Sequence, residues 1–127
     1  MRLISLAVLV LTALTACTRP PSSFVDYASV EAAPPPGEML GVWRGPMGSG
    51  LLTFRITPTG RIASCIEDGA YRYAGEAKYT CGAINFEDGS RAGMRLSRNG
   101  DLILASPPGN QAAVLHPVTA GEAVWCR

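Results

Sequence analysis

The chain has 127 residues, a formal net charge of +1 and a single histidine. This length allows one domain, and a balanced charge without a basic cluster argues against a nucleic-acid-binding protein. One histidine and no C-x-x-C motif argue against a metal site, so neither a metal nor another cofactor is expected.

The first element along the chain is an apolar segment. Met1-Arg2 supplies a positive charge, and residues 3–14 run LISLAVLVLTAL. This arrangement is typical of the n- and h-regions of a signal peptide. A membrane-spanning helix needs about 20 apolar residues, and Arg19 follows too soon for that. We therefore predict a signal peptide over residues 1–16.

The apolar segment ends in LTAC at residues 14–17. This stretch resembles the lipobox of bacterial lipoproteins, in which a branched aliphatic residue and two small residues precede a cysteine. The resemblance implies cleavage before Cys17, which would carry a diacylglycerol and often a further acyl chain such as palmitate. Two or more chains anchor a protein stably. Thr18, where Asp would favour retention in the inner membrane, implies an outer-membrane lipoprotein facing the periplasm.

The next stretch is rich in proline. Residues 18–37 run TRPPSSFVDYASVEAAPPPG, and proline runs favour extended spacers. Ser23 is a possible N-cap for a short helical turn in its middle. We favour a linker and predict a lipidated N-terminus with a Pro-rich tether over residues 17–37.

Residues 38–127 have the pattern of a β domain. Leu52, Phe54 and Ile56 alternate with polar residues, which predicts a half-buried strand. Turn residues recur about every ten positions, near 58, 68, 88, 99, 108 and 120. Asn99-Gly100 is the strongest hairpin signal, because both positions tolerate a positive φ. We predict an all-β fold, a small antiparallel meander forming a barrel or sandwich of seven to nine short strands, with Val124–Cys126 as the last.

The domain begins with Gly41-Val42-Trp43. These residues resemble the G-x-W opening of lipocalins and related small barrels, where the tryptophan plugs one barrel end. The resemblance implies a small lipocalin-like barrel. The alternative, a core tryptophan on the first strand, is favoured because the domain is much shorter than a lipocalin.

Three cysteines remain if Cys17 is lipidated. The oxidising compartment outside the inner membrane permits disulfides, and the odd number predicts one bridge and one free thiol. If Ile62 and Trp125 point inward, Cys65 and Cys126 both point outward. This parity favours a Cys65–Cys126 bridge, with Cys81 as the alternative partner of Cys65.

No catalytic residues are predicted. His116 lacks a G-x-S-x-G nucleophile motif in the chain. The pairs Glu67-Asp68 and Glu87-Asp88 each precede a glycine, as expected of solvated hairpin turns.

Aromatic and basic residues mix most densely in one stretch. Tyr and Arg are frequent in interface hot spots, so the candidate partner-binding residues are Tyr71, Arg72, Tyr73 and Tyr79. We predict a non-enzymatic, lipid-anchored module that binds, assembles or inhibits an envelope partner. The alternative is a lipocalin-like carrier of an apolar ligand. Large inward residues such as Leu52 and Phe54 argue against the carrier, because they fill a barrel.

Overall fold

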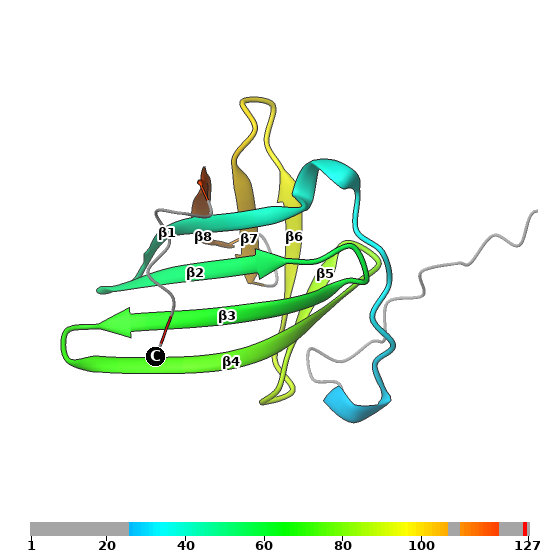
Figure 1. Cartoon of the computed structure of the whole chain (residues 1–127), viewed down its shortest axis with the longest axis horizontal. Coiled ribbons are helices and arrows are strands. Elements are labelled where there is room, and N and C mark those ends of the chain that lie inside the picture. The colour runs from blue at the N-terminus through cyan, green and yellow to red at the C-terminus, as the bar shows by residue number, and fades with distance from the viewer. Residues whose placement is uncertain (1–25, 107–109, 120–125, 127) are drawn as a thin grey trace, which may run out of the picture.

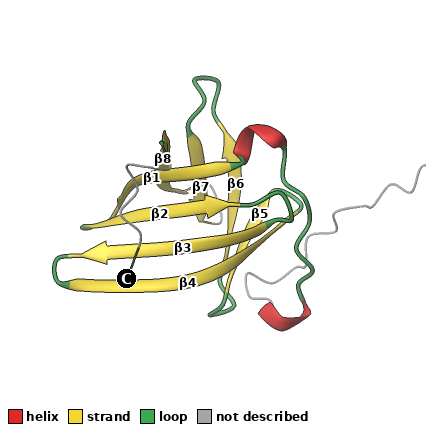
Figure 2. Ribbon diagram, in the orientation of Figure 1, coloured by secondary structure: helices red, strands yellow, loops and turns green. Residues whose placement is uncertain are grey.

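Eight antiparallel strands follow one another around a closed barrel, in which the last strand pairs with the first (Figures 1 and 2). The computed structural model describes residues 26–106, 110–119 and 126. The strands are β1 (Gly41–Met47), β2 (Gly50–Ile56), β3 (Arg61–Asp68), β4 (Tyr71–Thr80), β5 (Ala83–Phe86), β6 (Arg91–Leu96), β7 (Leu102–Ser106) and β8 (Asn110–Val118). Two 3-10 turns, η1 (Tyr27–Ser29) and η2 (Gly37–Met39), precede β1. The predicted all-β fold of seven to nine strands is confirmed.

Alternation along the strands builds the barrel interior. Leu52, Phe54 and Ile56 are at most 2% exposed, because every second side chain of β2 points inward. The same parity holds on the other strands, and the core joins residues of all eight. Among the described residues, no helix has the length and apolar character needed to cross a bilayer.

Three of the hairpins share one geometry. Their loops are Pro58–Gly60, Glu87–Gly89 and Arg98–Gly100, and each glycine has a φ of 86° or 87°. In each loop the glycine N–H donates to the carbonyl three residues earlier, as in a type I turn followed by a left-handed residue. The Asn99-Gly100 hairpin is therefore confirmed. Only its glycine has a positive φ, because the loop has three residues rather than two.

Trp43 lies in the core at the start of β1. Its indole Nε1 donates to the backbone oxygen of Met39 at 2.9 Å, and both side chains are at most 5% exposed. Met39 ends η2, so this turn is fastened to the barrel at the beginning of the first strand. A core tryptophan on that strand was the favoured interpretation of the G-x-W motif.

The second half of the predicted tether lies against the barrel. Ala33 N–H donates to the backbone oxygen of Tyr79 at 2.8 Å, and Lys78 Nζ donates to Tyr27 O at 3.0 Å. A Cβ on Gly60 would lie 2.1 Å from Ala33 O, so glycine is what permits this approach. The turn η1 is capped by Asp26, not by Ser23, which lies outside the described residues.

A disulfide joins Cys65 on β3 to Cys126 near the C-terminus, with a Cα–Cα distance of 5.6 Å. This is the pairing that strand parity favoured. Cys65 faces away from the barrel interior and yet is 1% exposed. Cys81 is disulfide-bonded too, so the predicted free thiol is wrong. Of the predicted strand Val124–Cys126, only Cys126 is described, and it is not in a strand.

Candidate binding site

Unequal strand lengths leave one side of the barrel open. β4 pairs with β3 from Tyr71 to Lys78, but with β5 only from Ala77 to Thr80. The reason is that β5 ends at Phe86, where the next hairpin loop begins. Residues 71–76 therefore have β3 on one side and no described strand on the other. Figure 1 shows this part of β4 running past β5 at the lower edge of the sheet.

The backbone groups of β4 alternate between its two edges. Tyr79 N–H donates to Gly60 O, on the β3 side, whereas Glu76 N–H donates to the Glu87 carboxylate, on the other side. By this alternation the N–H and C=O groups of Arg72 and Ala74 also face the open edge. All three even-numbered residues of this stretch are exposed.

A cavity of about 360 Å³ lies inside the barrel beside this edge. Its lining residues come from β1 to β5 and from the loop between β5 and β6, and are Met47, Leu52, Ser64, Ile66, Tyr73, Gly75, Glu76, Phe86, Glu87, Asp88 and Ser90. Ser64 and Gly75 are cross-strand partners that point inward. Because both are small, they leave the space that larger side chains fill elsewhere in the core.

The cavity has an apolar floor and an acidic rim. Leu52, Ile66 and Phe86 form the floor, and Glu76, Glu87 and Asp88 supply the carboxylates. We call this end of the barrel, with the cavity and residues 71–76, the mouth. Its volume falls within the range of ligand pockets, at the small end.

Ser90 holds the Asp88 carboxylate in its charged form. Its hydroxyl donates to Asp88 Oδ1 at 2.6 Å and its backbone N–H donates to the same oxygen at 2.8 Å. The side-chain hydrogen bond is the larger cause and the backbone bond the second, and together they lower the pKa of Asp88 below its ordinary value. The Asp88 carboxylate therefore stays charged to a lower pH than an aspartate without these hydrogen bonds.

We expect Ser90→Ala to raise the pKa of Asp88 toward its ordinary value. The lowered folded-state pKa stabilises the protein above the unfolded pKa, and this contribution disappears as pH falls through the folded value. The variant should therefore lose stability at neutral pH and less so at acid pH. An NMR titration of the Asp88 carboxyl carbon tests the shift, with Ser49→Ala as a control. An unchanged Asp88 titration would contradict the assignment.

Three of the four predicted partner-binding residues lie at the mouth. Tyr71 and Tyr73 are 63% and 49% exposed, Arg72 is exposed between them, and Tyr73 also lines the cavity. Tyr79 was wrongly included, because it is only 7% exposed. It pairs with Ile84 on β5, so neighbouring strands cover it where they do not cover Tyr73.

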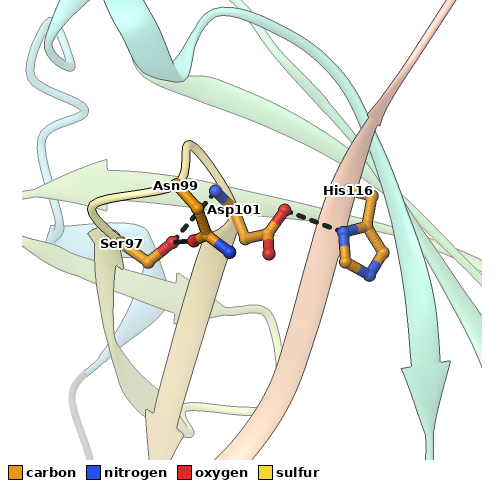
Figure 3. Close-up of polar contacts among 4 residues, drawn as sticks. All are labelled: Ser97, Asn99, Asp101 and His116. Atoms are coloured by element: carbon orange, nitrogen blue, oxygen red, sulfur yellow. Dashed lines mark hydrogen bonds and ion pairs between the residues drawn. The ribbon is translucent and has the colours of Figure 1, made fainter.

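His116 has an acidic partner, Asp101 (Figure 3). Its Nδ1 lies 2.8 Å from Asp101 Oδ1, the arrangement of a base and the residue that orients it. The hydroxyl oxygen of Ser97 accepts a hydrogen bond from the backbone N–H of Asp101, at 3.1 Å, rather than bonding the imidazole. Among the described residues, no hydroxyl or thiol hydrogen-bonds the other imidazole nitrogen.

One group of possible metal donors gathers around the disulfide. The donor atoms of Cys65, Glu67 and Cys126 lie within 4.8 Å of one another. Both sulfurs are joined to each other, so neither is available as a thiolate ligand.

The comparisons with known proteins bear on the fold. No protein-family model matches the chain, and no curated protein sequence does. Among solved structures, the chain is similar to the crystal structure of a lipoprotein YedD from Klebsiella pneumoniae subsp. pneumoniae MGH 78578. The TM-score is 0.55 at 16% sequence identity, covering 77% of this chain and 88% of that one. At this identity the similarity concerns the fold alone.

Proposed function

We propose that this chain is a lipid-anchored lipoprotein of the bacterial cell envelope, and that its barrel binds another envelope protein without catalysing a reaction. The LTAC stretch at residues 14–17 supports the anchor. The similarity to a lipoprotein barrel is consistent with it. Thr18 supports placement in the outer membrane, facing the periplasm.

The mouth is the observation that carries the binding role. Tyr71 and Tyr73 present large amphipathic rings on one face of β4 and Arg72 is exposed on the other, and Tyr73 lines the apolar cavity. Tyr and Arg are the residues most enriched where interfaces concentrate their binding energy, and such residues surround pockets that take partner side chains. The Asp101–His116 pair supports no catalytic role, because no described nucleophile joins it.

The anchor is tested by the intact mass of the protein extracted from its own membranes. We expect a chain that begins at Cys17 and carries acyl chains, and we expect Cys17→Ser to release it from the membrane. The sulfur of a lipidated Cys17 is a thioether and cannot also form a disulfide. The disulfide partner of Cys81 should therefore be mapped on the same sample. An unlipidated chain beginning at Met1 would contradict the anchor.

Partner binding is tested by site-specific photo-crosslinking in living cells. A photoreactive amino acid at position 73 should give a discrete adduct with one envelope protein. The matched control is Arg98, which is also exposed, in the β6–β7 hairpin loop. Adducts of equal yield at both positions, or none at position 73, would contradict binding at the mouth.

A carrier of a small apolar ligand is the second candidate, and the cavity favours it. Leu52, Phe54, Ile56 and Trp43 fill part of the barrel as the sequence suggested, yet about 360 Å³ stays open next to them. Trp125 lies outside the described residues. Native mass spectrometry of the gently extracted protein separates the candidates, since a co-purified small molecule would favour the carrier.

A further inference from the structure

We propose that the mouth binds its partner by strand addition: an extended segment of the partner pairs with the open edge of β4. The segment inserts an apolar side chain into the cavity and presents basic side chains to the acidic rim. This inference rests on the proposed partner-binding function and specifies the chemistry of the partner.

The open edge offers what an added strand requires. Residues 71–76 span about 20 Å at the rise of a β-strand, enough for a segment of five or six residues. The N–H and C=O groups of Arg72 and Ala74 face outward and meet no strand among the described residues. In strand addition the main-chain hydrogen bonds supply affinity, and pockets for alternate side chains supply specificity.

Gly75 determines where the partner's side chain enters. Side chains directly opposite each other in paired strands lie on the same face of the sheet. The residue of an added strand opposite Gly75 would therefore face the cavity. Gly75 has no side chain, and its cross-strand partner Ser64 is small. A Cβ at Gly75 would lie 3.2 Å from Tyr73 Cε1 and 3.5 Å from Glu87 Oε1, so these two side chains must move for an apolar group to reach the floor of Leu52, Ile66 and Phe86.

The rim sets the charge of the partner. Glu76, Glu87 and Asp88 line the cavity, and Ser90 donates two hydrogen bonds to the Asp88 carboxylate. Arg72 is the basic residue of the mouth, and its cross-strand partner is a further carboxylate, Glu67. Lys78 lies nearby on β4 but is directed to Tyr27, where its ammonium stands 4.2 Å from the ring centroid. A lysine or arginine next to the partner's inserted residue would complement this excess of carboxylates. Such charge complementarity speeds association with a basic segment and disfavours binding of an acidic one.

Glu87 occupies the edge when no partner is bound. Its carboxylate accepts the Glu76 N–H, the group that a pairing strand would otherwise engage. A charged side chain on an exposed edge is a known way to prevent indiscriminate pairing. An incoming strand would take over the Glu76 N–H, and the released Glu87 would pair with its basic residue.

The test uses the full chain in a mild detergent and three synthetic peptides. The probe is acetyl-Thr-Lys-Phe-Lys-Thr-amide. One control replaces both lysines by glutamate, and the other keeps the side chains but N-methylates alternate backbone amides. We expect saturable NMR shifts at Ala74 and Gly75 with the probe, at a Kd on the order of 1 mM or below. Both controls should bind at least about tenfold more weakly, a difference of about 1.4 kcal/mol.

Two variants test the mechanism on the protein side. Ala74→Pro removes an N–H that faces the open edge, where proline is tolerated because β3 pairing does not use it. We expect it to abolish probe binding, with Ala74→Ser as the control. Glu87→Gln keeps an acceptor for Glu76 N–H but removes the charge, so it should reduce the preference for the lysine probe. The control variant Glu31→Gln, at an exposed position of the N-terminal segment, should leave the preference for the lysine probe unchanged.

The outcomes separate the two proposals. No saturable binding of the probe, or equal binding of the N-methylated peptide, overturns strand addition. If the position-73 adduct in cells persists in Ala74→Pro, strand addition is also overturned while partner binding at the mouth stands. If no adduct forms at position 73 in the otherwise unchanged protein, the proposed function itself fails, whatever the peptides do.

Discussion

Replacing Cys65 and Cys126 together by alanine is expected to lower the free energy of unfolding by about 4 kcal/mol. The bridge closes a loop with a sequence separation of 61, and a crosslink over such a loop strongly restricts the unfolded chain. Small domains bury little surface in proportion to their length, so a loss of this size is a large share of their stability. Urea unfolding followed by circular dichroism measures it.

The single variant Cys126→Ala separates the crosslink from local packing. It breaks the same loop but leaves the Cys65 side chain in its buried position. Both variants should therefore lose nearly the same stability. A loss in the double variant below about 1 kcal/mol would show that the bridge contributes little, as for strained or redundant crosslinks.

Trp43→Ala is expected to lower the free energy of unfolding by about 3–5 kcal/mol. The indole is 4% exposed in the core, so its removal leaves a cavity that the rigid barrel cannot collapse around. It also removes the hydrogen bond that fastens η2 to β1 through Met39. Urea unfolding should be followed by circular dichroism, because the substitution changes the tryptophan fluorescence.

Trp43→Phe separates these two contributions. It keeps most of the apolar volume but leaves the Met39 oxygen without its donor, which costs about 1–3 kcal/mol. We therefore expect a loss clearly smaller than that of the alanine variant. Equal losses would mean that the hydrogen bond to Met39, not the ring volume, dominates the role of Trp43.

Local pattern was enough to predict most of the strands and several of their turns, but it missed the turn between β4 and β5 at Cys81-Gly82. The period of two along residues 52–56 identified the inward face, and glycine after Asp or Asn identified the hairpins. Strand parity placed Cys65 on the outer face, where the bridge to Cys126 forms, whereas the parity assumed for Cys126 does not apply because it is not in a strand. These features depend on neighbours in sequence, which is why single-sequence reasoning reached them.

The mouth depends on contacts that are distant in sequence. Tyr71, Tyr73 and Tyr79 share one parity, so the pattern of β4 alone cannot tell which of them is covered. What separates them is the length of β5, which stops at Phe86 and covers Tyr79 only. Small residues at inward positions, Ser64 and Gly75, were the available signal for the cavity, but their pairing becomes visible only once the register is known.

The attachment of the N-terminal segment was equally non-local. It joins a backbone N–H at Ala33 to a carbonyl on β4 and needs the missing side chain of Gly60. A periodic pattern of apolar residues does not predict such a contact. A proline-rich stretch is extended both as a free linker and when it lies along a sheet, so composition could not distinguish the two.

The place where this segment meets the barrel also has a consequence for orientation. Ala33 is held beside Gly60 and Tyr79, where β3 begins and β4 ends, whereas the mouth lies where β3 ends and β4 begins (Figure 1). Between residues 17 and 26 the chain can reach at most about 30 Å. In a protein anchored at Cys17, this reach would keep the barrel close to the bilayer, with the Ala33 attachment and the mouth at opposite ends of β3 and β4. A partner of the mouth would then have to come within that distance of the membrane.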